Sequence, residues 1–116
     1  MYQQLCQDFQ KYQSTKGKRP RTVEGYKYLL GYLFRFLEQK GITDIKEVKK
    51  DTLLSYQEFL YHELKNKDGG RLSLRYQSGL INVLNPFFTY LVVSDQIMYN
   101  PANGIDKPRL QKRLPR

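Results

Sequence analysis

Apolar and aromatic side chains recur every three or four residues through most of this chain, which is the spacing of a helix with one buried face. In the first stretch they are Tyr2, Leu5, Phe9 and Tyr12, and the pattern ends at Ser14. The stretch STKGKRPR that begins there contains a glycine and a proline, which interrupt regular structure. The pattern therefore predicts a first helix that ends in a hinge.

Two further helices are predicted after the hinge. The second has Thr22 as its N-cap and ends at Gly41, because glycine favours the left-handed conformation that often follows a helix. Asp51 is the N-cap expected for the third helix. The buried faces predicted by the spacing are Val23, Tyr26, Leu30, Leu33 and Leu37 in the second helix and Leu53, Tyr56, Leu60 and Leu64 in the third.

A turn at 66–71 leads into a fourth helix, which Ser73 caps and whose wide apolar stripe predicts a central position. Pro86 lies inside this pattern, where it removes a backbone donor and clashes with the preceding turn, so a kink is expected near 82–86. Asn100 and Pro101 begin a short helical turn. No strand pattern of useful length occurs, so the expected fold class is all-α, with four main helices and a short fifth one.

Size and composition fit one small domain. The 116 residues, 40% of them hydrophobic, suffice for a single core. The lone Cys6 excludes an internal disulfide and indicates a reducing compartment. Without a secretion signal or an apolar run of about 20 residues, we expect a cytoplasmic protein that does not bind membranes. Without a cluster of metal ligands or a glycine-rich phosphate loop, we expect no metal and no cofactor.

The net charge of +9 is concentrated in two short stretches. Four basic residues lie between positions 16 and 21 and five between 107 and 116, while the other hundred residues carry eleven basic and eleven acidic side chains. A neutral body with two basic segments is typical of a module that binds along a polyanion, because each neutralised phosphate releases counterions. The charge pattern therefore points to nucleic acid before any motif is considered.

Three phrases, TVEGYKYLLGYLFRFL, NVLNPFFTYLV and YNPANGIDKPRLQKRLP, form an ordered series with Gly41, Asp51 and Ser73 between the first two. This series, which runs from about Tyr2 to Pro115, resembles the N-terminal core-binding, or SAM-like, domain of tyrosine recombinases, the phage-integrase and Xer-type family. The resemblance implies an orthogonal helical bundle that clamps one face of duplex DNA at a recombination core site. It also implies a domain at 1–105 and a basic interdomain linker at 106–116, leading to a catalytic domain that this chain lacks.

Three features depart from the family pattern. The family often has Arg or Lys on the DNA-facing side of its fourth helix, whereas this chain has Gly79, Leu80 and Asn85 there, so a weaker grip on phosphates is expected. Tyr76 replaces a frequent threonine, and Pro86 is uncommon in that helix.

Candidate DNA contacts lie at two helix starts and on the outer face of the fourth helix, which also includes Thr89. Free N–H groups at a helix start favour phosphate, and asparagine can pair with adenine in the major groove. Tyr28 and Arg35 are second-tier candidates. Plain helix capping and a solvated helix surface remain alternative interpretations. The predicted DNA-binding residues are Lys18, Arg19, Arg21, Thr22, Lys27, Arg71, Ser73, Arg75, Ser78, Asn82, Asn85, Lys107, Arg109, Lys112 and Arg113.

Catalysis by this chain is not expected. It has ten tyrosines but only one histidine, His62, and no set of Arg, Lys and His to activate a tyrosine or stabilise the charge of a phosphorane. The leading hypothesis is therefore a non-catalytic DNA-binding domain of a tyrosine recombinase, monomeric in isolation, with double-stranded DNA and other recombinase protomers as partners. The alternatives are a helical protein-interaction or regulatory domain and a stand-alone nucleic-acid binder without a catalytic partner.

Overall fold

The computed structural model describes residues 2–62 and 73–105. Every regular element in these ranges is a helix, so the all-α prediction is confirmed. Leu64, Arg71 and the predicted linker at 106–116 lie outside the described residues. The elements are α1 (Tyr2–Thr15), α2 (Pro20–Gln39), the 3-10 helix η1 (Ile45–Glu47), α3 (Lys50–His62), α4 (Leu74–Asn82) and α5 (Leu84–Val93).

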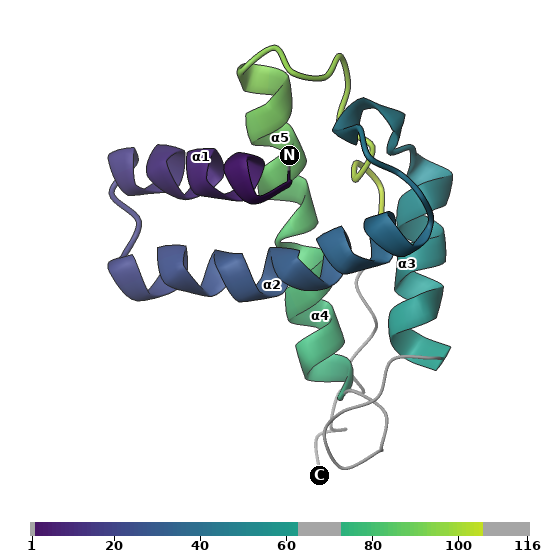
Figure 1. Ribbon diagram of the computed structural model, residues 1–116. Helices are drawn as coiled ribbons and strands as arrows, with labels where there is room; N and C mark the ends of the chain where they lie inside the picture. The colour runs from purple at the N-terminus through teal and green to yellow at the C-terminus, as the bar shows by residue number, and fades with distance from the viewer. Residues whose placement is uncertain (1, 63–72, 106–116) are drawn as a thin grey trace, which may run out of the picture.

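The helices form two crossed layers (Figure 1). α1 and α2 run antiparallel and pack against each other, while α4 and α5 pass crosswise behind them. α3 packs against α4 and completes the second layer. This arrangement is the orthogonal bundle expected from the sequence. It leaves α2 and the beginning of α4 facing the same, lower side of the molecule (Figure 1).

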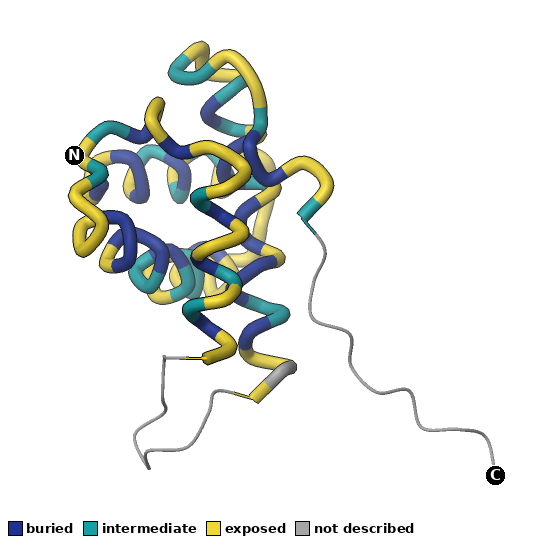
Figure 2. Tube along the Cα trace, turned by 90° about the vertical axis from the view of Figure 1, so that its right-hand side faces the viewer, coloured by how far each residue is buried: buried dark blue, intermediate teal, exposed yellow. Residues whose placement is uncertain are grey.

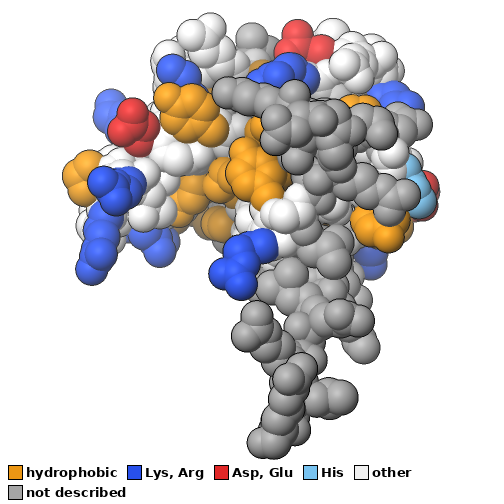
Figure 3. All heavy atoms as spheres, turned by 90° about the horizontal axis from the view of Figure 1, so that it is seen from below, with side chains coloured by type: hydrophobic (Ala, Val, Ile, Leu, Met, Phe, Trp, Pro, Cys, Tyr) orange, Lys and Arg blue, Asp and Glu red, His pale blue; other side chains and the backbone are white. Residues whose placement is uncertain are grey.

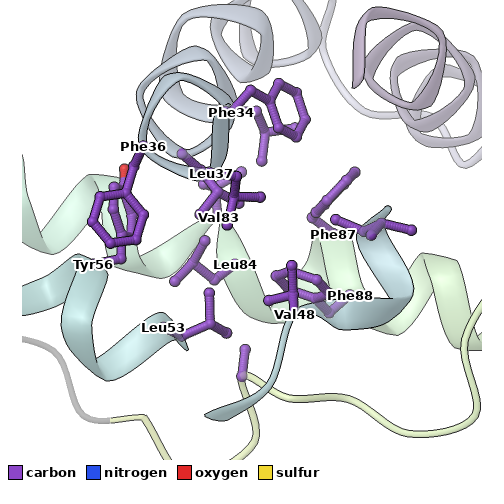
Figure 4. Packing of buried hydrophobic residues seen from close by; sticks show 14 of the residues in the cluster. Phe34, Phe36, Leu37, Val48, Leu53, Tyr56, Val83, Leu84, Phe87 and Phe88 are labelled. Atoms are coloured by element: carbon purple, nitrogen blue, oxygen red, sulfur yellow. The ribbon is translucent and has the colours of Figure 1, made fainter. Parts of the chain in front are cut away.

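Aromatic side chains and leucines fill the space between the layers (Figure 4). Phe87 is fully buried, and its ring centroid lies 5.4 Å from that of Phe9, 5.8 Å from that of Phe34 and 5.2 Å from that of Phe88. Buried positions follow the inner face of each helix (Figure 2), as the apolar spacing predicted. Tyr12 and Tyr26 are exceptions, because both are only partly buried.

The start of α2 differs from the prediction. The helix begins at Pro20, and the residue before it is Arg19, with an extended backbone (φ −63°, ψ 142°). Proline is favoured at the first helical position because its φ suits the helix and its missing N–H would have no partner there. The N-cap prediction for Thr22 is therefore wrong, and Thr22 is the third residue of the helix. At the other end Gly41 has a φ of 75°, as expected after a helix.

α3 also begins earlier than expected, at Lys50, two residues before the start that an Asp51 N-cap would give, so Asp51 lies within its first turn and is not the N-cap. The backbone N–H of Lys49 donates to the hydroxyl of Thr52 at 3.2 Å. A side chain three residues into the helix thus reaches back to the capping position, as in half of a capping box. For α4 the prediction is confirmed, because the Ser73 hydroxyl accepts the N–H of Tyr76 at 3.1 Å.

The kink predicted near Pro86 is a break between two helices. α4 ends at Asn82 and α5 begins at Leu84, with Val83 between them. Pro86 has no N–H to bond the Asn82 carbonyl and its ring clashes with that group, so the hydrogen-bond ladder stops four residues before the proline. The ladder resumes with the N–H of Phe87, which donates to Val83 at 3.1 Å. Since Val83 is buried, the break is packed into the core.

The chain turns after α5 at Asp95, which has a positive φ of 61°. Further on, the N–H of Asn103 donates to the carbonyl of Asn100 at 3.2 Å, and the N–H of Ile105 to that of Ala102 at 3.1 Å. The short helical turn predicted here therefore consists of two overlapping turns. Within the described ranges the one short helix is the 3-10 helix η1, which lies before α3 and not at the position expected for the short fifth helix.

Candidate nucleic-acid interface

The first group of predicted contacts lies where α1 meets α2. Lys18, Arg19 and Arg21 are exposed and make no ion pair with any described residue. Basic side chains gather over this end of the molecule in Figure 3, which views it from below. Gln10 of α1 donates to the carbonyl of Val23 at 2.8 Å and holds the first turn of α2 in place. The result is a corner held in place by α1, with three cations that have no ion-pair partner in residues 2–62 and 73–105.

The backbone at this corner is open as well. No side chain caps α2, and the N–H groups of Arg21 and Thr22 have no acceptor among the described residues. Free N–H groups and the positive end of the helix dipole together favour an anion. Thr22 is exposed, so its hydroxyl is available as a further donor. The start of α2 can therefore bind a phosphate through backbone and side chains.

The second group lies at the start of α4. Arg75 is exposed and has no ion pair among the described residues. Ser73 accepts the cap hydrogen bond, which leaves its own O–H free to donate outward. Ser78 is half-buried and Asn82 is exposed on the same helix, and neither side chain has a hydrogen-bond partner among the described residues. On the outer face that the helix period predicted, Arg75 and Asn82 are exposed and Ser78 is half-buried.

Asn85 and Thr89 have a partner that the sequence interpretation did not include. The Nδ2 of Asn100 donates to Oδ1 of Asn85 at 2.7 Å and to Oγ1 of Thr89 at 3.1 Å. Both side chains are exposed, yet each already serves the segment that follows α5. An asparagine whose acceptor is engaged is less suited to pair with adenine, which needs both the donor and the acceptor of the amide.

Tyr32 of α2 and Tyr76 of α4 join the two helices. Their rings meet edge to face, with centroids 5.9 Å apart. Burial and a hydrogen bond with Tyr32 raise the pKa of Tyr76 to about 12. The guanidinium of Arg35 lies 5.3 Å from the centroid of the Tyr32 ring, within range of a cation–π interaction. We call Tyr32, Tyr76 and Arg35 the tyrosine bridge.

Tyr56 of α3 contributes to the same region from inside the core. The residue is fully buried, and its hydroxyl has no hydrogen-bond partner in the part of the chain that the structure describes. Burial raises the pKa of Tyr56 far above its usual range, and the nearby Tyr32 and Tyr76 add to the effect. An unpaired buried hydroxyl costs about 1–3 kcal/mol. The Tyr56 ring therefore packs beneath the tyrosine bridge, and its buried hydroxyl lowers the stability of the fold.

Three other positions that the sequence analysis discussed, Leu80, Gly79 and Lys27, have different surroundings. Leu80, which aligns with DNA-facing positions of the family, is completely buried and belongs to the core. Gly79 beside it is half-buried, and nothing lies within 4 Å of the place a Cβ would occupy. Lys27 is exposed but lies next to α1, where it lines a hollow with Cys6 and Arg35. Gly79 therefore leaves room for a side chain on α4, and Lys27 lines a hollow between α1 and α2.

The described residues offer no assembled catalytic or metal centre. His62 is exposed, and its ring meets that of Tyr61 edge to face, with centroids 4.8 Å apart. No group of three His, Cys, Asp or Glu side chains in the described ranges could hold a metal ion. Nor does any helix there have the length and apolarity needed to cross a bilayer. The predicted contacts Arg71, Lys107, Arg109, Lys112 and Arg113 lie outside the described residues.

Several characterised proteins resemble this chain. Tyrosine recombinase XerC 2 of Ralstonia nicotianae is 33% identical over 100 residues, which are 86% of this chain and 28% of that protein. The chain is a homologue of the Xer-type tyrosine recombinases. XerC of Actinobacillus succinogenes is 29% identical over 84% of the chain and 30% of its own length, and XerD of Shewanella oneidensis 26% over 88% and 31%. No family model matches the chain, and no solved structure matches it significantly.

The Xer-type relationship confirms the family resemblance seen in the sequence. The chain spans about 30% of the length of these relatives, while the match takes in most of its own residues. Two features of this Xer-type homologue were not identified from the sequence, the tyrosine bridge and the contacts of Asn100. In the sequence the tyrosine bridge is marked only by Tyr76 in place of a threonine, and the Asn100 contacts only by the phrase NPA. Neither feature specifies which residue it contacts.

Proposed function

We propose that this chain is a non-catalytic DNA-binding domain of a Xer-type tyrosine recombinase, and that it grips one face of duplex DNA at a recombination core site. The observation that carries the proposal is the pair of basic helix starts, whose arginines make no ion pair with a described residue and which are joined through the contact between Tyr32 and Tyr76. Duplex DNA presents phosphates at fixed spacing, so two such groups held in place by a core can engage it with little ordering of the protein.

The predicted contacts divide into two kinds. Arg19, Arg21 and Arg75 contact phosphates, because guanidinium groups bind phosphate bidentately and the free N–H groups nearby add donors. Lys18, Thr22 and Ser73 extend these two phosphate sites. Ser78 and Asn82, which carry no charge, face sugar or base edges in the groove. Phosphate contacts set position and affinity in this scheme, and Asn82 is the candidate for reading a base.

Strand cleavage and rejoining are assigned to another part of the parent protein. The relatives are named as tyrosine recombinases, and the chain spans about 30% of their length. We infer that residues 1–105 form the DNA-binding domain and that 106–116 begin a basic linker toward a catalytic domain. Other recombinase protomers on the same DNA and a cytoplasmic location belong to the same proposal.

The salt dependence of duplex binding tests the proposal. A fluorescent duplex is titrated with the chain at several salt concentrations, and binding is measured by anisotropy. Each phosphate contact contributes about −0.9 to the slope of log K against log salt, so the three arginine contacts alone predict a slope of about −3, and contacts from Lys18 or the basic segment make it steeper. A slope near zero would exclude DNA binding and favour a protein-interaction domain. Equal affinity for a single strand of the same sequence would contradict a clamp for duplex DNA.

A further inference from the structure

The segment after α5 is tied back to that helix by one side chain. The Nδ2 of Asn100 donates to Asn85 at 2.7 Å and to Thr89 at 3.1 Å, and its Oδ1 accepts the backbone N–H of Ala102 at 2.8 Å. One amide thus uses both its donors and its acceptor. No other side chain of the segment 95–105 hydrogen-bonds to a helix more than a few residues away among the described residues.

The orientation of this amide follows from its partners. A backbone N–H can only donate, so the atom that faces Ala102 must be oxygen, and Nδ2 must then point toward α5. Asn85 and Thr89 are four residues apart and lie on the same face of the helix. Asn100 therefore recognises a two-residue site on α5 and closes the NPA turn at the same time.

The backbone after this contact is also held in place. Pro101 and Ala102 are buried. Gly104 has a φ of 86°, and the Nζ of Lys50 lies 3.1 Å from the place where a Cβ would be. Beside the turn lies a hollow of about 250 Å³. It is lined by Asn82 of α4, by Asn85 of α5, and by Gly104 and its neighbours. The last described residues are thus fixed against α4, α5 and the start of α3.

We propose that Asn100 is a positioning residue that holds residues 100–105 on α5, and with them the point from which the basic segment 106–116 continues. This inference rests on the proposed function, because it gives that segment a place on the DNA. Five cations, Lys107, Arg109, Lys112, Arg113 and Arg116, follow this anchored turn. Anchoring their point of departure raises their effective concentration near the DNA backbone without adding a contact.

A distance measurement without DNA tests the anchoring itself. Cys6→Ser removes the native thiol, Ser55→Cys and Asp106→Cys provide two spin labels, and pulsed electron resonance gives their distance distribution. The distribution is expected to broaden in Asn100→Ala, Asn85→Ala and Thr89→Val. It should stay narrow in Asn85→Asp and Thr89→Ser, which keep an acceptor for Asn100, and in Asn103→Ala. An unchanged distribution in Asn100→Ala, or equal broadening in Asn103→Ala, overturns the inference.

A DNA-binding cycle then separates positioning from general support. Asn100→Ala is made in the native chain and in a chain whose five cations after residue 106 are replaced by glutamine. We expect Asn100→Ala to weaken binding by about three- to tenfold in the native chain and to have no effect in the neutralised one. Equal weakening in both chains shows a merely structural role and overturns the inference. If the native chain does not bind DNA, the proposed function fails, and the spin-label distances alone decide the inference.

Discussion

The starts of α2 and α4 both carry arginines on the lower side of the molecule, but they are built differently. α2 begins with a proline and has no side-chain cap, and three cations around it are unpaired among the described residues. α4 begins under the Ser73 cap, and Tyr76 in its first turn contacts Tyr32 of α2. Within the described ranges Arg75 is the cation of that turn.

The difference between the two helix starts suggests different roles in DNA binding, one in affinity and the other in the placement of the domain on the duplex. An uncapped start leaves its N–H donors to a ligand, whereas a capped start uses a donor within the fold. We therefore expect α2 to supply most of the binding free energy and α4 to fix where along the duplex the domain lies. Each expectation can be tested by changing one start and leaving the other intact.

The largest effect is expected from removing the α2 cations. Arg19→Gln with Arg21→Gln should lower the steepness of the salt slope by about two units and weaken duplex binding by more than tenfold at low salt. Arg75→Gln should lower the steepness of the salt slope by about one unit. The control is Lys46→Gln with Lys49→Gln, which changes the same charge on exposed residues away from both starts. If that control weakens binding as much as the α2 pair, only net charge matters and the comparison fails.

A cation added at Gly79 is expected to strengthen DNA binding, by less than the loss of the α2 cations weakens it. The site has room for a side chain, so Gly79→Lys adds a cation to α4 beside Arg75 without displacing a neighbour. The salt slope should steepen by about one unit. Ser55→Lys, on the exposed side of α3, is the matched control for added charge. An equal gain from the control would show that Gly79 does not face the DNA.

The support of α4 can be tested through two tyrosines of opposite expected sign. Tyr56→Phe removes a buried hydroxyl that has no partner among the described residues, so the free energy of unfolding should rise by about 1 kcal/mol. Tyr76→Phe removes the hydrogen bond with Tyr32 and should lower it by about 1 kcal/mol. Urea denaturation measures both. A loss of stability in Tyr56→Phe would mean that this hydroxyl has a partner in solution.

The helices could be predicted from the sequence because their causes are local. Leu30, Leu33 and Leu37 repeat at helical spacing and are all completely buried. The break before Pro86 follows from one missing donor and one clash. The start of α2 was misplaced because the preference of proline for the first position competes with the preference of threonine for the cap, and spacing does not decide between them.

The candidate site could be predicted only in part. The exposure of Arg19, Arg21 and Arg75 follows from charge and helix period. The partners of Tyr76 and Asn100 depend on how α4 crosses α2 and how the chain returns to α5, and periodicity specifies neither. Asn100 meets a residue 15 positions earlier in the chain. An outer helix face predicted from period alone is therefore incomplete wherever a later segment folds back onto it.

The smallest expected effect distinguishes the two helix starts by their caps. Ser73→Ala should lower the free energy of unfolding by about 1 kcal/mol, because it removes the acceptor of the Tyr76 N–H. Thr22→Ala should leave it unchanged or raise it by about 0.5 kcal/mol, since Thr22 caps nothing and alanine is the better helix former. Ser73→Asp, which retains a cap acceptor, is the control for urea denaturation. Equal losses in the two alanine variants would show that α2 has a cap after all, and its free N–H groups would no longer distinguish it from α4.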